Sequence, residues 1–131
     1  MMIRRAMILL DGPMGTELAT RGVPTPPPGW SAYALETHPE VVRAVHGEYV
    51  RAGAEVHRAN TFRTQPGVFP ARFVALARRA VGLAREAGAV RVAGSLAPVE
   101  DCYRPDLAPP AAGARRTHRA VAEALRDAGA D

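Results

Sequence analysis

The chain has 131 residues, of which 47% are hydrophobic and 23% are charged, and its formal net charge at pH 7 is +4. This length and composition predict one soluble globular domain and exclude a largely disordered chain. Every basic residue is an arginine dispersed among acidic residues, which argues against a nucleic-acid partner. The lack of lysine excludes a Schiff-base nucleophile and a phosphate-binding P-loop in this chain acting alone.

The hydropathy pattern predicts a cytoplasmic protein with no membrane partner. No apolar run approaches the roughly 18 to 20 residues that span a bilayer, and the apolar run at the start is too short for a secretory signal. The single cysteine, Cys102, cannot form an internal disulfide, which agrees with a reducing compartment.

The first predicted strand covers residues 6–10 and ends at the segment "DGPMGT". Asp11 before Gly12 has two readings in this segment: a turn-forming residue, or a carboxylate that holds a ligand. A proline-rich loop, "VPTPPPGW", follows. Trp30 and Tyr33 beside this loop either cap a pocket or pack the loop against the sheet. The next helix is predicted to begin with a capping box formed by Thr37 and Glu40, and to end at Gly53.

Two further strand and helix pairs follow in the same order. Strands are predicted at residues 55–59 and 90–93, and helices at 70–87 and 112–128. The three helix ends resemble one another, as "RAGAEV", "EAGAVR" and "DAGAD", which indicates a repeated βα unit. The last of these has the form of a helix end followed by the start of a fourth strand, so we expect an incomplete fold.

Alternating strands and helices predict a parallel sheet, in which ligands bind at the carboxyl ends of the strands. Asp11, then Asn60 with Thr61, and then Ser95 each follow one of the three strands, so we expect them at one edge. His57 and Arg58 are polar residues within a predicted buried strand. They therefore need hydrogen-bonding partners or a wet location.

Four segments in order, "LLDGPMGTELATRG", "HPEVVRAVHGEYVRAGAEVHRANTF", "VAGSLAP" and "HRAVAEALRDAGAD", resemble the homocysteine S-methyltransferase family. The resemblance implies an α/β fold, the first three βα units of a (β/α)8 barrel, with residues 1–131 as a partial homocysteine-binding domain. It implies transfer of a methyl group from a small-molecule donor to the thiol of homocysteine, giving methionine. The substrate-binding residues it implies are Asp11, whose carboxylate would pair with the substrate ammonium, Gly12, Asn60, Thr61, Phe62 and Ser95.

The family holds the substrate sulfur on zinc, through cysteines carried by later strands of the barrel. Cys102 matches none of these positions, so the resemblance implies neither a zinc ligand nor a catalytic residue within this chain. We therefore expect an amino-terminal fragment that is inactive alone and binds no zinc. The alternative is a non-enzymatic module that binds an amino acid, associates with itself or associates with a separately encoded carboxyl-terminal half.

Overall fold

The computed structural model describes residues 7–131. Short 3₁₀ helices, here η1 and η2, accompany five α-helices and two strands in this part of the chain. The elements in order are α1 (Gly15–Thr20), η1 (Trp30–Tyr33), α2 (Ala34–Thr37), α3 (Pro39–Arg51), β1 (Val56–Arg58), α4 (Phe73–Glu86), β2 (Arg91–Ala93), η2 (Pro105–Leu107) and α5 (Ala111–Asp127). None of the helices described is both long enough and apolar enough to cross a membrane.

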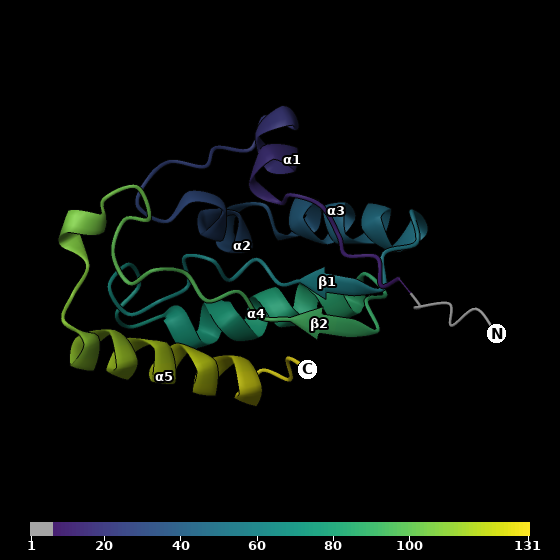
Figure 1. Ribbon diagram of the computed structural model, residues 1–131. Helices are drawn as coiled ribbons and strands as arrows, with labels where there is room; N and C mark the ends of the chain where they lie inside the picture. Colours follow the sequence, from purple (N-terminus) through teal and green to yellow (C-terminus); the bar gives the residue numbers. More distant parts are fainter. Residues whose placement is uncertain (1–6) are drawn as a thin grey trace.

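The two strands form a parallel sheet in which His57 of β1 lies opposite Val92 of β2. Each is followed along the chain by a long helix, α4 or α5, as predicted (Figure 1). At the outer edge of β2, the Asp131 amide donates a hydrogen bond to the Val92 carbonyl at 2.9 Å. The Asp131 carboxylate in turn accepts one from the Val92 amide at 2.7 Å.

The strand predicted at residues 6–10 is not formed as a strand in the described residues. Its last residue, Leu10, makes a single parallel bridge to Val56, and the Asp11 amide donates to the Val56 carbonyl at 3.1 Å. Residue 6 lies outside the described part of the chain. Residues 7–10 are all exposed, so their apolar side chains gain too little burial to favour a longer pairing.

The predicted capping box of α3 is also wrong. Thr37 is the last residue of α2, and its hydroxyl donates to the Tyr33 carbonyl at 3.0 Å. The chain turns at His38, and α3 then begins at Pro39 with no side-chain cap. Local pattern could not reveal the short helix that precedes α3 and uses the Thr37 hydroxyl.

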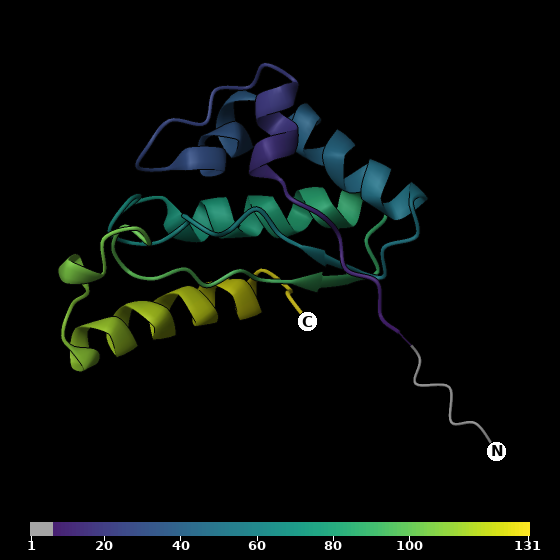
Figure 2. The ribbon, with the colours of Figure 1, turned by 45° about the horizontal axis from the view of Figure 1, so that its top comes forward.

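The hydrophobic core lies around α4, which runs beside the strands and contacts α3 on one side and α5 on the other (Figure 2). Its buried face consists of Leu76, Ala77, Ala80, Val81, Leu83 and Ala84. Val92 of β2 and Leu125 of α5 belong to the same buried cluster. The three long helices end, as expected, at glycines with left-handed backbone, Gly53, Gly88 and Gly129.

Candidate functional site

A pocket of about 570 Å³ lies beyond the carboxyl ends of the strands. It is lined by the segment that follows Leu10, by the loop that follows β1 and by the loop that follows β2. These are the three segments that the sequence places on one edge of the sheet. Gly12, Asn60, Phe62 and Ser95 all line the pocket, so four of the six predicted substrate-binding residues meet there.

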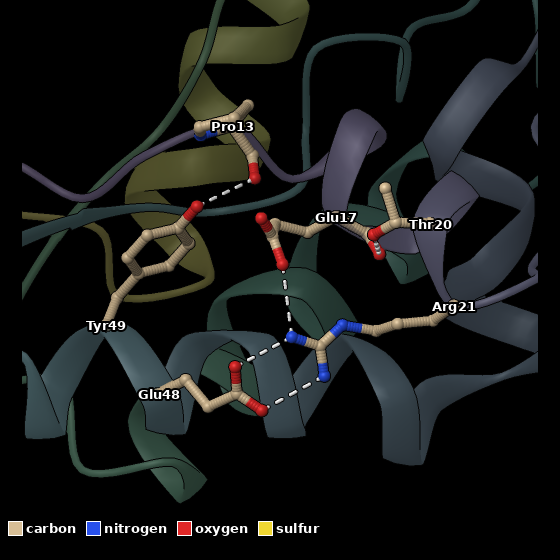
Figure 3. Close-up of polar contacts among 6 residues, drawn as sticks. All are labelled: Pro13, Glu17, Thr20, Arg21, Glu48 and Tyr49. Atoms are coloured by element: carbon tan, nitrogen blue, oxygen red, sulfur yellow. Dashed lines mark hydrogen bonds and ion pairs between the residues drawn. The ribbon is translucent and has the colours of Figure 1, made fainter.

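The segment after Leu10 rests on α3 through a close contact at Gly12. A Cβ atom on Gly12 would lie 2.5 Å from the Tyr49 hydroxyl oxygen, and that hydroxyl donates to the Pro13 carbonyl at 3.1 Å. Figure 3 shows the second anchor, in which the Arg21 guanidinium lies between Glu17 of α1 and Glu48 of α3. Position 12 therefore requires glycine, because the Tyr49 side chain leaves no room there for a Cβ atom.

Asp11 does not line the pocket, because its carboxylate is held by Arg58. The Arg58 backbone amide donates to Asp11 Oδ2 and the Arg58 Nε donates to Asp11 Oδ1, each at 2.9 Å. The Asp11 side chain is only 3% exposed, whereas that of Arg58 is 50% exposed. In the described residues the Asp11 carboxylate thus joins two neighbouring segments of the sheet through Arg58.

Arg58, a polar residue of this strand, has the hydrogen-bonding partner that the sequence could not identify, and that partner is Asp11. The Arg58 Nη2 donates to the carbonyls of Asp11 and Gly12, at 3.0 and 3.1 Å. Arg58 is a lining residue of the pocket, and its side chain is 50% exposed. No acidic side chain is among the described residues that line this pocket, and Arg58 is its only charged lining residue.

Asn60 and Thr61 tie the loops together. The Asn60 amide nitrogen donates to the Ser31 carbonyl at 2.8 Å, and the Asn60 amide oxygen accepts from the Ser31 hydroxyl at 2.7 Å. The Thr61 hydroxyl accepts from the Ser95 amide at 2.8 Å and is 3.2 Å from the Ser95 carbonyl. These contacts fix the positions of the pocket walls.

Sequence reasoning missed a buried residue of the same loop, Arg63. Its Nε donates to the Pro28 carbonyl at 3.0 Å and its Nη1 donates to the Glu100 carbonyl at 3.1 Å. Arg63 therefore connects the proline-rich loop to the loop after β2. The sequence feature that could have identified Arg63 is its position three residues beyond Asn60, in a run of polar residues that follows a strand.

Aromatic residues form the apolar part of the pocket. Trp30 lines it and its ring lies 6.3 Å from that of Tyr103, another lining residue. Trp30 has a φ of 51°, a left-handed conformation that is unfavourable for a bulky residue. Tyr33 instead packs edge-on against Phe69 at 5.5 Å. Trp30 thus faces the pocket, and Tyr33 packs the loop.

His57 points away from the pocket, toward His46 of α3. The two rings are 6.4 Å apart, and none of their four nitrogens has a hydrogen-bonding partner among the described residues. Burial lowers the pKa of His46 from its ordinary 6.5 to about 4, against the opposing charge of Asp11. The described residues thus supply no hydrogen-bonding partner for His57.

The pocket residues do not fit a zinc site. Cys102 is the one thiol of the chain and lines the pocket, but no imidazole or carboxylate accompanies it there. A structural or catalytic zinc ion needs three or four protein ligands. Within residues 7–131, no group of three or more His, Cys, Asp and Glu side chains is arranged to hold a metal ion.

Comparison with known proteins identifies the family. A family profile described as Homocysteine S-methyltransferase matches residues 8–131. The chain is 36% identical to the Homocysteine S-methyltransferase of Escherichia coli over 151 aligned positions, covering 98% of this chain and 49% of that protein. It is 38% identical over 86 positions to Homocysteine S-methyltransferase 1 of Zea mays, covering 60% of this chain and 26% of that protein.

Solved structures agree with these relatives. The crystal structure of the Escherichia coli homocysteine methyltransferase MmuM in its metallated form matches with a TM-score of 0.82 at 36% identity. The match covers 97% of this chain and 52% of MmuM. The apo form of MmuM matches with a TM-score of 0.74. The chain thus spans about half the length of these relatives, and it belongs to the homocysteine S-methyltransferase family.

Proposed function

We propose that this chain forms the homocysteine-binding wall of a homocysteine S-methyltransferase, as a partial (β/α)8 barrel domain. The supporting observation is the strand-end pocket, where Gly12, Asn60, Phe62 and Ser95 from three separate family-like motifs meet. Independent turns have no reason to converge in this way. Pockets at the carboxyl ends of parallel strands are where barrel enzymes bind their substrates.

The lining matches the chemistry of homocysteine, which carries charged groups at one end and a thiol on a short apolar chain. Arg58 provides a cation, and Phe62, Trp30 and Met14 provide apolar surface. Methyl transfer requires the thiol to lose its proton, since the thiolate is the nucleophile. No lining side chain of the described pocket is a carboxylate or an imidazole that could accept that proton.

We therefore propose that these residues bind homocysteine and that methyl transfer needs groups from outside them. The zinc ligands implied by the family resemblance are among those groups. The product would be methionine, with the methyl group supplied by a second small molecule. Under this proposal the 131-residue chain binds homocysteine without turning it over.

Isothermal titration calorimetry of the purified chain with L-homocysteine under reducing conditions tests the proposal. Binding without methyl transfer from S-methylmethionine or S-adenosylmethionine is the expected result. Absence of binding at millimolar homocysteine would refute the assigned site, and methyl transfer with stoichiometric zinc would refute the assigned division of labour.

A matched pair of variants links binding to the pocket. Phe62 lines the pocket and is 43% exposed, whereas Val74 on α4 is 44% exposed and lies outside it. We expect F62A to weaken homocysteine binding about fivefold, because it removes roughly 1 kcal/mol of apolar contact. V74A should bind as the wild type does. Equal affinity of F62A and V74A would place the ligand elsewhere.

A second candidate function, association with another polypeptide, is favoured by the exposed apolar residues next to the sheet. Met7 is 93% exposed, and Ile8, Leu9 and Leu10 are each more than half exposed. Unpaired backbone and apolar side chains at a sheet edge promote association. Light scattering after size-exclusion chromatography tests this, with a monomer at micromolar concentration as the contrary result.

A further inference from the structure

The single cation of the described pocket, Arg58, bears on which charged group of homocysteine binds there. Asp11, the nearest carboxylate, is 3% exposed and does not line the pocket. Its two oxygens accept hydrogen bonds from the Arg58 backbone amide and Nε. The substrate ammonium would have to displace Arg58 to reach this carboxylate. Asp11 is thus placed to hold Arg58.

The hydrogen bonds that the Arg58 guanidinium already makes determine how many of its N–H donors are free to bind a ligand. Arginine has five N–H donors in a fixed plane. The Nε group donates to Asp11, and Nη2 donates to the Asp11 and Gly12 carbonyls. The two N–H groups of Nη1 have no partner among residues 7–131, and half of the Arg58 side chain is exposed to solvent.

These contacts give Arg58 the properties of an anion-binding residue. Its position is fixed by three hydrogen bonds from its side chain, so little conformational freedom is lost when a ligand binds. No described acidic side chain lines the pocket to repel an anion.

We propose that Arg58 binds the carboxylate of the substrate through Nη1, and that Asp11 is a positioning residue that holds Arg58. This inference rests on the proposed function for the identity of the substrate. The ligand class is a short carboxylic acid with a thiol at its far end, because Trp30, Phe62 and Tyr103 give the pocket an apolar wall. The substrate ammonium then contributes less to binding than the carboxylate does.

Two analogues of homocysteine separate these contributions. 4-Mercaptobutanoate lacks the amine, and 3-amino-1-propanethiol lacks the carboxylate. Calorimetry with the 131-residue chain should give an affinity for 4-mercaptobutanoate at least tenfold above that for the aminothiol, because hydrogen bonds to charged groups contribute about that much. Tighter binding of the aminothiol would overturn the inference, because it would mean that a protein carboxylate binds the ammonium group.

The ratio of these two affinities is also the readout for variants, because a merely structural defect weakens both ligands alike. R58Q should reduce the ratio to about one, and R58K should restore part of it. R91Q, which changes an exposed arginine of the neighbouring strand outside the pocket, should keep the wild-type ratio. If R58Q leaves the buried Asp11 uncompensated and unfolds the chain, D11N/R58Q removes both charges and carries the same expectation.

The possible results separate carboxylate binding by Arg58 from the proposed function, homocysteine binding by the pocket. Homocysteine binding with a wild-type ratio in R58Q or D11N/R58Q overturns the inference and leaves the proposed function standing. Arg58-dependent binding of 4-mercaptobutanoate without binding of homocysteine supports carboxylate recognition and overturns the proposed function. No binding of any of the three thiols to the wild-type chain overturns both.

Discussion

His46 makes the stability of the fold depend on pH. Its ring is fully buried, and burial lowers its pKa from 6.5 to about 4. The unfolded chain therefore binds a proton near pH 6.5 that the folded chain takes up only near pH 4. Between these values the unfolded state holds more protons, so stability falls as the pH falls. The full loss is about 3 kcal/mol, of which about 2 kcal/mol is lost by pH 5.

We expect the variant H46L to lose this pH dependence. Leucine has a similar volume and removes two ring nitrogens that have no hydrogen-bonding partner in residues 7–131. Urea unfolding followed by circular dichroism at pH 7, 6 and 5 measures the effect. The free energy of unfolding should fall by about 2 kcal/mol less in H46L than in the wild type between pH 7 and pH 5.

The half-buried His38 provides the matched control. It hydrogen-bonds Thr37 at the chain turn before α3, and H38Q leaves His46 in place. H38Q should retain the wild-type loss of stability between pH 7 and pH 5. An equal loss in H46L and the wild type would refute the reasoning, because a buried neutral imidazole could not then be the source.

Three further substitutions test the packing of the site and the core by urea unfolding. G12A should cost about 1 to 3 kcal/mol, since its Cβ would lie 2.5 Å from the Tyr49 hydroxyl oxygen. R63L should cost about 2 to 3 kcal/mol, because it leaves two loop carbonyls without their donors. L125A should cost about 2 to 5 kcal/mol, because Leu125 is 4% exposed in the main cluster.

Each of these substitutions has a control in the same chain. A Cβ atom on Gly15 would contact nothing within 4 Å, so G15A should have the same free energy of unfolding as the wild type. R78L removes an exposed arginine of α4, and L107A removes an exposed leucine of η2. Losses in these controls that equal those in G12A, R63L or L125A would contradict the assigned contacts.

The βα order and the helix ends could be predicted from sequence, because both depend on local pattern. Glycine tolerates the left-handed backbone that ends a helix, and Gly53, Gly88 and Gly129 each have a φ near +90°. The strand at residues 6–10 could not be judged locally, since its length depends on what pairs with it. Only Leu10 forms a bridge.

Site residues were predictable by position but not by role. Adjacent residues of a strand point to opposite faces, so His57 and Arg58 had to separate. Their pattern did not show which one faces the core. Asp11, the partner of Arg58, lies 47 residues away along the chain, and the pairing of Leu10 with Val56 that brings the two residues together forms only in the folded sheet. Only the folded structure therefore separates the buried charge of Asp11 from the half-exposed charge of Arg58.

The hydrogen bonds made by Asn60, Thr61 and Arg63 determine how the loops around the pocket open. Residues 60–63 form hydrogen bonds both to the segment around the proline-rich loop and to the loop after β2. Neither of these two loops can therefore detach without breaking hydrogen bonds to residues 60–63, which also hold the other loop. Segments joined in this way open as one cooperative unit. The amides of all three loops should then exchange with solvent water at a shared opening free energy, and a ligand on one wall would slow exchange in the other two.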